Sequence, residues 1–365
     1  MSKITVALLF GGKSGEHEVS LRSAASILQA LDRSKYDVIP IGITKEGHWR
    51  SDPKFLEAAF PQILEGGSPV LLPAEPSGNT VLQLVANSGS IGRRAKIDVV
   101  FPALHGTYGE DGTLQGLLDM ANIPYVGAGV LGSSVGMDKD VMKRLLEHAG
   151  LPVGAFRTVL DHQWRFRPGE IQQLIERELG YPCFVKPANL GSSVGISKVK
   201  SAEALPAAME LAAEFDRKIV VEKGLDAREI ECSVLGNDHP RASVPGEIIP
   251  SNEFYDYQAK YLDDNSRLLI PAPLDESATR RVQELAIQTF LATECSGLAR
   301  VDFFLEKQSG EVYVNEINTL PGFTSISMYP KLWEASGLAY SDLIDQLIQL
   351  AIERHQARQA KRTSY

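Results

Sequence analysis

Residues 4–31 read ITVALLFGGKSGEHEVSLRSAASILQAL. The run at 4–10 is largely apolar and has the length of a buried strand, whereas the apolar residues between 18 and 31 recur at helical spacing. A glycine-rich turn joins the two segments. Because a strand that leads through a short turn into a helix is the unit from which parallel sheets are built, this stretch predicts an α/β domain.

The first 130 residues continue this alternation. Apolar runs at 36–43 and 97–104 predict two more strands of the same parallel sheet. We therefore expect residues 1–130 to form an α/β domain whose ligands bind at the carboxyl ends of the strands. Residues 65–90 match neither pattern, and the sequence predicts only a surface excursion for them.

The pattern changes near residue 150. A helix predicted at 138–148 ends before Gly150 and Pro152, which commonly follow helices. Beyond it the chain is richer in strands, which predicts an α+β region rather than a second doubly wound sheet. We place its two subdomains at 131–222 and 223–365. The strands expected there are 183–186, 218–222, 230–235, 298–305 and 312–317, and the helices are 202–214 and 277–294.

Composition restricts the class of partner. The 365 residues are 44% apolar and 23% charged, as in soluble globular proteins, and the net charge is −9. This charge argues against broad attraction to nucleic acid or to an anionic membrane, and no apolar stretch approaches the roughly 20 residues of a membrane span. The 3 cysteines lack CxxC spacing and indicate neither a disulfide framework nor a zinc site. We therefore expect a cytoplasmic protein without a signal peptide.

Two loops at the ends of predicted strands carry polar side chains. One loop holds Glu16 directly before a helix, and the other holds His105 among several glycines. Neither loop matches GxGxxG or GxxxxGK[ST], which argues against a generic dinucleotide or P-loop site. Because both loops fall at one edge of the same sheet, we favour a small polar ligand there. The alternatives are an ordinary tight turn for the first loop and a capped turn for the second.

A third segment, residues 184–195, reads FVKPANLGSSVG and places Lys186 on a strand just before a Gly/Ser loop. A lysine supplies a point charge for phosphate oxygens, and the N–H and hydroxyl groups of such a loop can fold over a triphosphate. The alternative, a hairpin turn with an exposed lysine, leaves the Gly-Ser-Ser run unexplained. The segment therefore favours nucleotide binding.

The strongest chemical signal lies on two predicted strands near the C-terminus. Arg300 and Asp302 are two residues apart on one strand, as are Glu316 and Asn318 on the next, so each pair projects to one face. Two carboxylates and an amide oxygen form a donor set suited to Mg²⁺. The alternative is a pair of salt bridges between strands, but apolar strands rarely bury so many polar groups.

The four segments together resemble the D-alanine–D-alanine ligase family, whose patterns GGxSxEHEVS, LHGxxGEDG, KPxxxGSSxG and ExNTxPGFT all occur here. The resemblance implies a Rossmann-like, pre-ATP-grasp domain followed by an α+β ATP-grasp fold. It also implies a cytosolic homodimer. Such an enzyme joins two D-alanine molecules at the expense of ATP and supplies a peptidoglycan precursor, with neither nucleic acid nor membrane as a partner.

The resemblance also assigns nucleotide and metal contacts to individual residues. Those matching contacts to the ATP phosphates are Lys143, Lys186 and Ser193. Those matching the adenine region are Glu222, Lys223 and Leu225, and Glu229 matches a ribose contact. Those matching the ligands of two Mg²⁺ ions, for which Mn²⁺ can substitute, are Asp302, Asn318 and the bridging residue Glu316.

The substrate residues follow from the same resemblance. Those that match groups orienting the substrates and the mobile loop are Glu16, Ser192 and Ser327, and Val19, His105 and Met328 are further substrate positions. The implied route runs through an acyl phosphate, with Arg300 and the Gly322 N–H stabilising the oxyanion. Lys260 and Tyr261 match a lid loop that excludes water, and Lys260 is also expected to contact the nucleotide.

Two alternatives come from other classes of protein. One is an ATP-grasp ligase for a different carboxylate and amine, against which Glu16, His105 and Tyr261 argue. The other is a nucleotide-binding regulator without turnover, which predicts gaps at Arg300 or in the metal set, and the sequence has none. D-lactate in place of the second D-alanine is a further possibility, which a tyrosine at position 261 disfavours.

Overall fold

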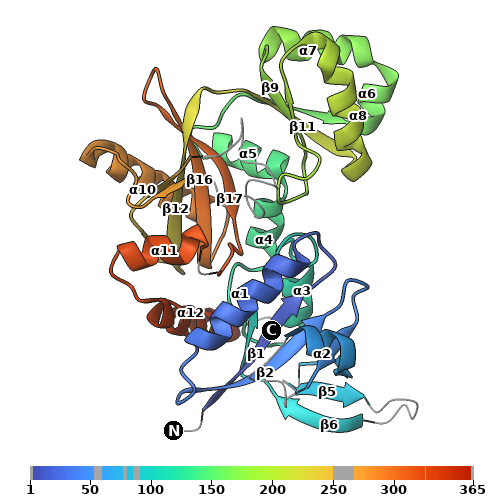
Figure 1. Ribbon diagram of the computed structural model, residues 1–365, viewed down its shortest axis with the longest axis vertical. Coiled ribbons are helices and arrows are strands. Elements are labelled where there is room, and N and C mark those ends of the chain that lie inside the picture. Colours follow the sequence, from blue (N-terminus) through green and yellow to red (C-terminus); the bar gives the residue numbers. More distant parts are fainter. Residues whose placement is uncertain are drawn as a thin grey trace.

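The computed structural model describes residues 3–52, 60–76, 80–84, 91–249, 267–324 and 326–362. Its strands form three sheets, which follow one another along the long axis of the molecule (Figure 1). The first sheet belongs to the N-terminal part of the chain. The second, which contains β9 and β11 and is called the central sheet for its place in the chain, lies at the opposite end of this axis. The third, which contains β12, β16 and β17, lies between the other two (Figure 1).

The N-terminal sheet has the order β6-β5-β4-β3-β2-β1-β7. Its strands β2, β1 and β7 are parallel, as expected, but β3 to β6 extend the sheet in antiparallel fashion, so the sheet is mixed. The residues that the sequence left as a surface excursion therefore include strands of this sheet. The strands are β1 (Ile4–Gly11), β2 (Tyr36–Ile43), β3 (Trp49–Ser51), β4 (Ser68–Leu71), β5 (Thr80–Leu84), β6 (Ile91–Lys96) and β7 (Val99–Pro102).

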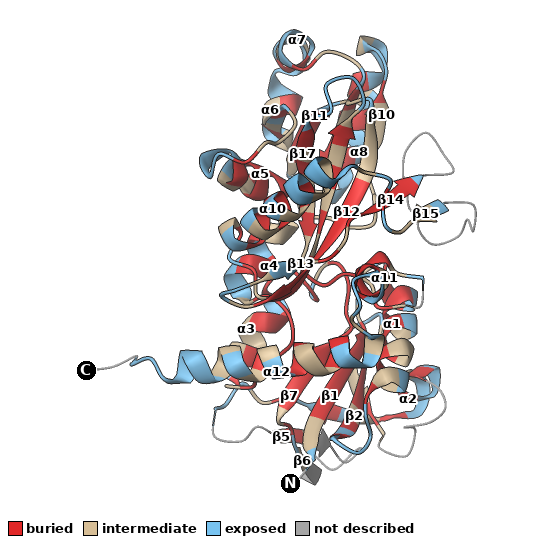
Figure 2. Ribbon diagram, turned by 90° about the vertical axis from the view of Figure 1, so that its left-hand side faces the viewer, coloured by how far each residue is buried: buried red, intermediate tan, exposed pale blue. Residues whose placement is uncertain are grey.

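Helices from both ends of the chain cover this sheet. The first, α1, follows β1 as predicted, and the last, α12, crosses β7 and contacts α1 (Figure 2). Residues of α12 share one apolar core with β1 and α1, although more than 300 positions separate Val6 from Leu347. The helices near this sheet are α1 (His17–Ala30), α2 (Phe60–Gly66), α3 (Thr113–Met120) and α12 (Tyr340–Gln359), whereas α4 (Val130–Met137) follows α3 and contacts β17 of the third sheet.

The central sheet is antiparallel and has the order β10-β9-β11-β8. One of its faces packs on apolar residues of α7 and α8, among them Ile175 and Met209. Its strands are β8 (Phe156–Leu160), β9 (Cys183–Pro187), β10 (Ser197–Val199) and β11 (Lys218–Lys223). The helices of this region are α5 (Lys139–His148), α6 (Asp161–Phe166), α7 (Pro168–Glu178), η2 (Ala202–Ala204) and α8 (Leu205–Phe215).

The third sheet is antiparallel and has the order β15-β14-β12-β16-β17, with β13 paired to β12. Its core lies between β12, β16, β17 and α10. The elements are β12 (Ala227–Gly236), β13 (Arg241–Ala242), β14 (Gly246–Ile249), β15 (Arg267–Leu269), α10 (Glu276–Ala292), β16 (Gly297–Glu306), β17 (Val312–Asn318) and α11 (Met328–Ala335). Among the described helices, none is both long and apolar enough to cross a membrane.

Candidate active site

A cavity of about 500 Å³ lies where loops of the N-terminal sheet, the Gly/Ser loop and the strands β16 and β17 meet. Polar side chains from all three regions face it. The residues that the sequence predicted for a site and that line this cavity are Glu16, Val19, His105, Ser192, Arg300, Glu316, Asn318, Gly322, Ser327 and Met328. Segments far apart in the sequence thus converge on one space.

Hydroxyl groups fasten the first predicted loop to the second. The hydroxyl of Ser14 donates to the carbonyl of His105 over 2.6 Å, and that of Ser20 donates to the carbonyl of Ala103. A Cβ on Gly106, whose φ is +71°, would lie 2.9 Å from a carboxylate oxygen of Glu16. A glycine at this position therefore lets the two loops approach closely enough to place Glu16 at the cavity.

His105 connects three segments of the chain. Its Nδ1 lies 3.0 Å from the carbonyl oxygen of Leu320, and its Nε2 lies 3.0 Å from the hydroxyl of Ser23. Burial lowers the pKa of His105 more than the Glu16 carboxylate raises it. The neutral ring thus donates from Nδ1 and accepts from Ser23 at Nε2. His105 lines the cavity, but both ring nitrogens already have protein partners, and its contact with a first D-alanine stays a prediction.

Glu110 is a buried carboxyl group at the cavity to which the sequence assigned no role. It accepts hydrogen bonds from the N–H of Gly106 over 2.7 Å and from the N–H of Leu320 over 3.3 Å. Burial, together with the nearby Glu16 carboxylate, raises the pKa of Glu110 to about 8. The GEDG motif that contains Glu110 is the sequence feature that could have pointed to this residue. The motif does not reveal the contact with Leu320, which is more than 200 residues away.

The Gly/Ser loop reaches the cavity from the central sheet. Ser192 and Ser193 have φ angles of +53° and +57°, in the left-handed region that favours glycine. A Cβ on Gly191 would lie 3.3 Å from a carboxylate oxygen of Glu16. The loop therefore lies against the N-terminal domain at the residue that the sequence expects to orient substrate.

Three residues predicted for nucleotide binding form a buried charge cluster. The Glu222 carboxylate lies between two ammonium groups, 3.4 Å from Lys143 Nζ and 2.9 Å from Lys186 Nζ. Burial lowers the pKa of Lys143, whereas in Lys186 the carboxylates of Glu222 and Glu316 outweigh burial and raise the pKa. The structure thus brings α5, β9 and β11 together at two cations suited to phosphate oxygens. The predicted adenine contact of Glu222 remains a prediction.

The other predicted nucleotide residues lie along the connection from β11 to β12. Lys223 is the exposed last residue of β11, Leu225 is partly buried in the turn, and Glu229 stands on β12. None of the three lines the cavity. They lie in the same chain segment as Glu222, at one edge of the lysine cluster, and their nucleotide contacts stay predictions.

The predicted metal residues face one another across two paired strands. In the register of β16 and β17, Arg300 pairs with Asn318 and Asp302 pairs with Glu316. The intervening residues Ala299, Val301 and Phe303 are buried in the core, so the polar residues occupy the opposite face. Asn318 Oδ1 accepts from the N–H of Leu320 over 3.2 Å. The strands therefore gather two carboxylates and one amide, which is the oxygen-rich donor set that Mg²⁺ prefers.

Arg300 is held by carboxylates on two strands. It forms a two-pronged contact with Asp302, with both N–O distances at 2.7 Å, and its Nε lies 3.0 Å from Glu231. Burial acts to lower the pKa of Arg300, but Asp302 and Glu231 outweigh it and raise the pKa well above the ordinary value. Glu231 was not among the residues predicted for the site. The sequence feature that could have pointed to Glu231 is its position between Ile230 and Cys232 on an otherwise apolar strand.

The segment after β17 forms the remaining wall. A Cβ on Gly322 would lie 2.8 Å from the hydroxyl oxygen of Ser327, and this hydroxyl also accepts from the N–H of Thr324 over 3.0 Å. Met328 begins α11. The lid residues expected at Lys260 and Tyr261 lie outside the described residues. The wall therefore contains the N–H expected to stabilise an oxyanion.

Known proteins match the chain over nearly its whole length. The family described as "D-ala D-ala ligase N-terminus" matches residues 5–128, and the family described as "D-ala D-ala ligase C-terminus" matches residues 145–349. The chain belongs to the D-alanine–D-alanine ligase family. Curated members include a D-alanine–D-alanine ligase of Natranaerobius thermophilus, which is 51% identical over 366 residues, covering 100% of this chain and 99% of the relative.

Solved structures of this family share the fold. The D-alanine–D-alanine ligase from Coxiella burnetii has a TM-score of 0.85 and 41% identity, with 98% of this chain and 97% of that chain covered. The VanG D-Ala:D-Ser ligase from Enterococcus faecalis also has a TM-score of 0.85, with 39% identity, 96% of this chain and 100% of that chain covered. The expected ATP-grasp architecture is therefore confirmed at the level of the overall fold.

Proposed function

We propose that this chain joins two D-alanine molecules to D-alanyl-D-alanine with consumption of ATP, as a cytoplasmic homodimer that supplies a peptidoglycan precursor. One observation carries the proposal. A single cavity brings Glu16 and His105 of the N-terminal domain together with Arg300, Glu316 and Asn318 of the third sheet. The family membership supports the same activity. The proposed partners are the substrates and a second copy of the chain, with neither nucleic acid nor a membrane among them.

The reaction has two steps. In the first, a carboxylate oxygen of one D-alanine attacks the γ-phosphorus of ATP, the bond to the β-phosphate oxygen breaks, and ADP leaves. In the second, the amine of the other D-alanine attacks the acyl carbon, loses a proton and displaces phosphate. Arg300 and the N–H of Gly322 both line the cavity and stabilise the oxyanion that forms on the acyl oxygen.

The lysine cluster binds the phosphates in this proposal. Lys143 and Lys186 supply two buried cations, and the Gly/Ser loop supplies the hydroxyl of Ser193. The end of β11, its connection to β12 and the start of β12 contact the rest of the nucleotide. The residues are Glu222, Lys223 and Leu225 at the adenine and Glu229 at the ribose, with Lys260 contributing from the lid.

The residues present fit a pair of Mg²⁺ ions. Asp302, Glu316 and Asn318 share one face of β16 and β17, and hard oxygen donors of this kind bind Mg²⁺ together with phosphate oxygens. Glu316 would hold both ions, and Mn²⁺ would be accepted in their place because it prefers the same donors. When bound, the metal ions neutralise charge on the phosphates during transfer.

The remaining residues hold the amino acids. Glu16, Ser192 and Ser327 line the cavity and orient the two substrates, and His105 contacts the first D-alanine. Val19 and Met328 supply apolar surface at the same cavity. Tyr261 belongs to a lid loop that keeps water from the acyl phosphate.

The decisive experiment measures both ADP release and the identity of the product. The purified protein is incubated with ATP, Mg²⁺ and D-alanine, either alone or together with D-serine, D-lactate or L-alanine. A further reaction contains no D-alanine. The products are identified by mass spectrometry. We expect D-alanyl-D-alanine as the main product and little ADP release without D-alanine. A product containing D-serine in preference to D-alanine would assign the chain the specificity named for the VanG relative instead.

A further inference from the structure

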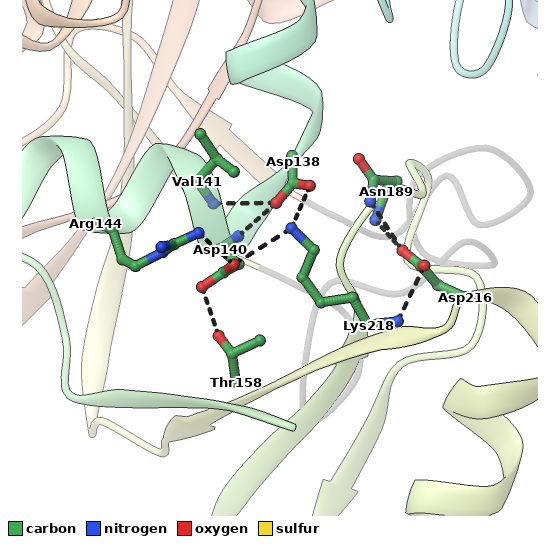
Figure 3. A network of polar contacts seen from close by, with 8 residues as sticks. All are labelled: Asp138, Asp140, Val141, Arg144, Thr158, Asn189, Asp216 and Lys218. Carbon is green, nitrogen blue, oxygen red and sulfur yellow. Dashed lines mark hydrogen bonds and ion pairs between the residues drawn. The ribbon is translucent and has the colours of Figure 1, made fainter. Parts of the chain in front are cut away.

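The junction between α8 and β11 contacts two elements of the proposed nucleotide site. We call residues 215–218 the 215–218 connector: Phe215 ends α8, Asp216 and Arg217 link the two elements, and Lys218 begins β11. The connector does not line the cavity. Its side chains instead contact the start of α5 and the Gly/Ser loop (Figure 3). Helix α5 carries Lys143, and the loop carries Ser193.

Asp216 holds the beginning of the Gly/Ser loop. Its Oδ2 accepts from the backbone N–H of Asn189 over 2.8 Å and from the Asn189 side-chain amide over 3.0 Å. Its Oδ1 accepts from the N–H of Lys218 over 3.1 Å, which fixes the carboxylate. Two hydrogen bonds to one ionised group are stronger than bonds between neutral partners. The first residue of the loop after Ala188 is therefore tied to the connector.

Phe215 lies at the other end of the same loop. A Cβ on Gly195, whose φ is +72°, would lie 2.7 Å from Cδ2 of the Phe215 ring. The last glycine of the loop therefore packs directly on this ring, with no room for a larger residue. The connector thus contacts the loop at both of its ends, while Ser192 and Ser193 lie between them.

Lys218 holds the N-terminus of α5. Its Nζ lies 2.6 Å from Asp138 Oδ2 and 3.3 Å from Asp140 Oδ2. Asp138 caps α5 by accepting from the N–H groups of Asp140 and Val141 over 3.1 and 3.0 Å. Asp140 also accepts from the hydroxyl of Thr158 on β8 over 2.7 Å. One ammonium therefore sets the cap of the helix that carries Lys143.

Direct contacts between α5 and the loop complete the arrangement. Lys139 donates from its backbone N–H to the carbonyl of Ala188 over 3.0 Å and from Nζ to the carbonyl of Leu190 over 2.7 Å. The N–H of Ala188 in turn donates to the carbonyl of Lys218 over 2.9 Å. The helix start, the loop start and the connector thus form one closed set of contacts.

The cost of burying charge suggests a reason for this arrangement. The Lys218 side chain is 13% exposed, and the side chains of its two partners, Asp138 and Asp140, are 15% and 7% exposed. Burial of an ion pair contributes little net stability compared with apolar packing, so such a pair serves best where geometry has to be fixed. Burial acts to raise the pKa of Asp138, but Lys218 and the Val141 N–H outweigh it, and the carboxylate is ionised at neutral pH.

We infer that Asp216 and Lys218 are positioning residues that set the spacing between Lys143 on α5 and the Gly/Ser loop, and thereby the affinity for the phosphates of ATP. The inference rests on the proposed function, because it takes those two elements as the phosphate-binding ones. Neither residue touches the nucleotide. The affinity for the nucleoside portion does not depend on them.

The test compares Lys218→Met with Lys35→Met. The control removes an ion pair of Lys35 with Asp345 at 3.1 Å, which lies outside the nucleotide site. Binding of ADP and of adenosine is measured by titration calorimetry or by competition, and the KM for ATP and for D-alanine by initial rates. We expect Lys218→Met to raise the Kd of ADP and the KM of ATP at least fivefold. Adenosine binding and the KM of D-alanine should change less than twofold, and the control should match wild type.

Two further variants separate positioning from mere stability. Asp216→Asn keeps the size of the side chain but removes the carboxylate, and should weaken ADP binding selectively even if Lys218→Met fails to fold. Lys218→Arg can bridge both aspartates and should restore ADP binding to within threefold of wild type. Equal weakening of ADP and adenosine, or unchanged ADP binding in both Lys218→Met and Asp216→Asn, would overturn the inference. The ADP titration needs no turnover, so absence of D-alanine ligation in the wild type would overturn the proposed function separately.

Discussion

Glu231 lies opposite Asp302 in the register of β12 and β16, and the carboxylates of both residues contact the guanidinium of Arg300. Asp302 is also a proposed metal ligand. Glu231 is therefore the counterion committed to Arg300, and it keeps the guanidinium in a fixed direction at the cavity. A positioning role of this kind can be separated from a purely structural one by kinetics.

Glu231→Gln should lower kcat at least tenfold, which corresponds to about 1.4 kcal/mol of barrier, because Arg300 loses one of its two carboxylate partners. The isosteric amide should keep the protein folded, as judged by circular dichroism. A matched control is Glu247→Gln, which weakens the pair between Glu247 and Arg228 on neighbouring strands. The control should retain kcat within twofold. Equal losses in the two variants would assign Glu231 a structural role only.

Glu316→Gln should nearly abolish turnover while leaving the protein folded, because an amide cannot bridge two cations as a carboxylate does. Conservative change at Asn318 should be tolerated better. Steady-state rates at saturating Mg²⁺ and Mn²⁺ provide the measurement. Retention of more than about a tenth of kcat, roughly 1.4 kcal/mol, would remove the bridging role from Glu316.

Glu110→Gln should stabilise the protein increasingly as the pH rises from about 5 to 8. Burial raises the pKa of Glu110 to about 8 in the folded protein, above the ordinary value of 4.5. Between these two values the folded state holds a proton that the unfolded state has released, so wild-type stability falls as the pH rises. Since one pKa unit corresponds to about 1.4 kcal/mol, the relative gain is on the order of 1–4 kcal/mol.

The measurement for Glu110 is the free energy of unfolding in urea at pH 5, 6.5 and 8. Glutamine keeps an acceptor oxygen for only one of the two N–H groups, of Gly106 or of Leu320, so the variant also carries a loss of stability that does not change with pH. A constant difference between wild type and Glu110→Gln across this range would mean that Glu110 is ionised in the folded protein.

Tyr261→Phe should keep ATP turnover but gain formation of D-alanyl-D-lactate. In the resembled family a tyrosine here shares hydrogen bonds with Glu16 and Ser192, and loss of one buried hydrogen bond costs about 0.5–1.5 kcal/mol, enough to change substrate preference several-fold. The gain should be larger at low pH, where more of the competing D-alanine amine is protonated. Tyr313→Phe on β17 is the control.

Mass spectrometry of the products at pH 6 and pH 8 measures the ratio of ester to peptide for the Tyr261 variant. If the wild type already favours D-lactate at neutral pH, or if the ratio is unchanged in the variant, the second-substrate preference has to be argued from another residue.

Elements with a strong apolar period were predictable from the sequence. The strand expected at 36–43 is β2 (Tyr36–Ile43), and the helix expected at 138–148 is α5 (Lys139–His148). Alternation along a strand also places Arg300 and Asp302 on one face of β16, and Glu316 and Asn318 on one face of β17, whereas the register that pairs the two strands comes from the structure. In each case, neighbours in the sequence decide the local structure.

Features that depend on distant neighbours were not predictable in the same way. The short strands β3 to β6 lack a long apolar run, and they form by pairing along the edge of the parallel core. Glu110 and Glu231 acquire their roles from Leu320 and Arg300, which no local pattern connects to them. The position of Glu222 between two lysines likewise requires three separate elements to pack.

The packing of α12 on the N-terminal sheet has a consequence for synthesis on the ribosome. Leu343, Leu347 and Ile348 belong to the same core as Val6 and Phe101, so the first domain obtains part of its interior from the end of the chain. The N-terminal sheet has to wait until the residues of α12 have been made before this core can close. Until then, an apolar face of the earliest-made strands remains open to chaperones, and the last helix is the element that ends this exposure.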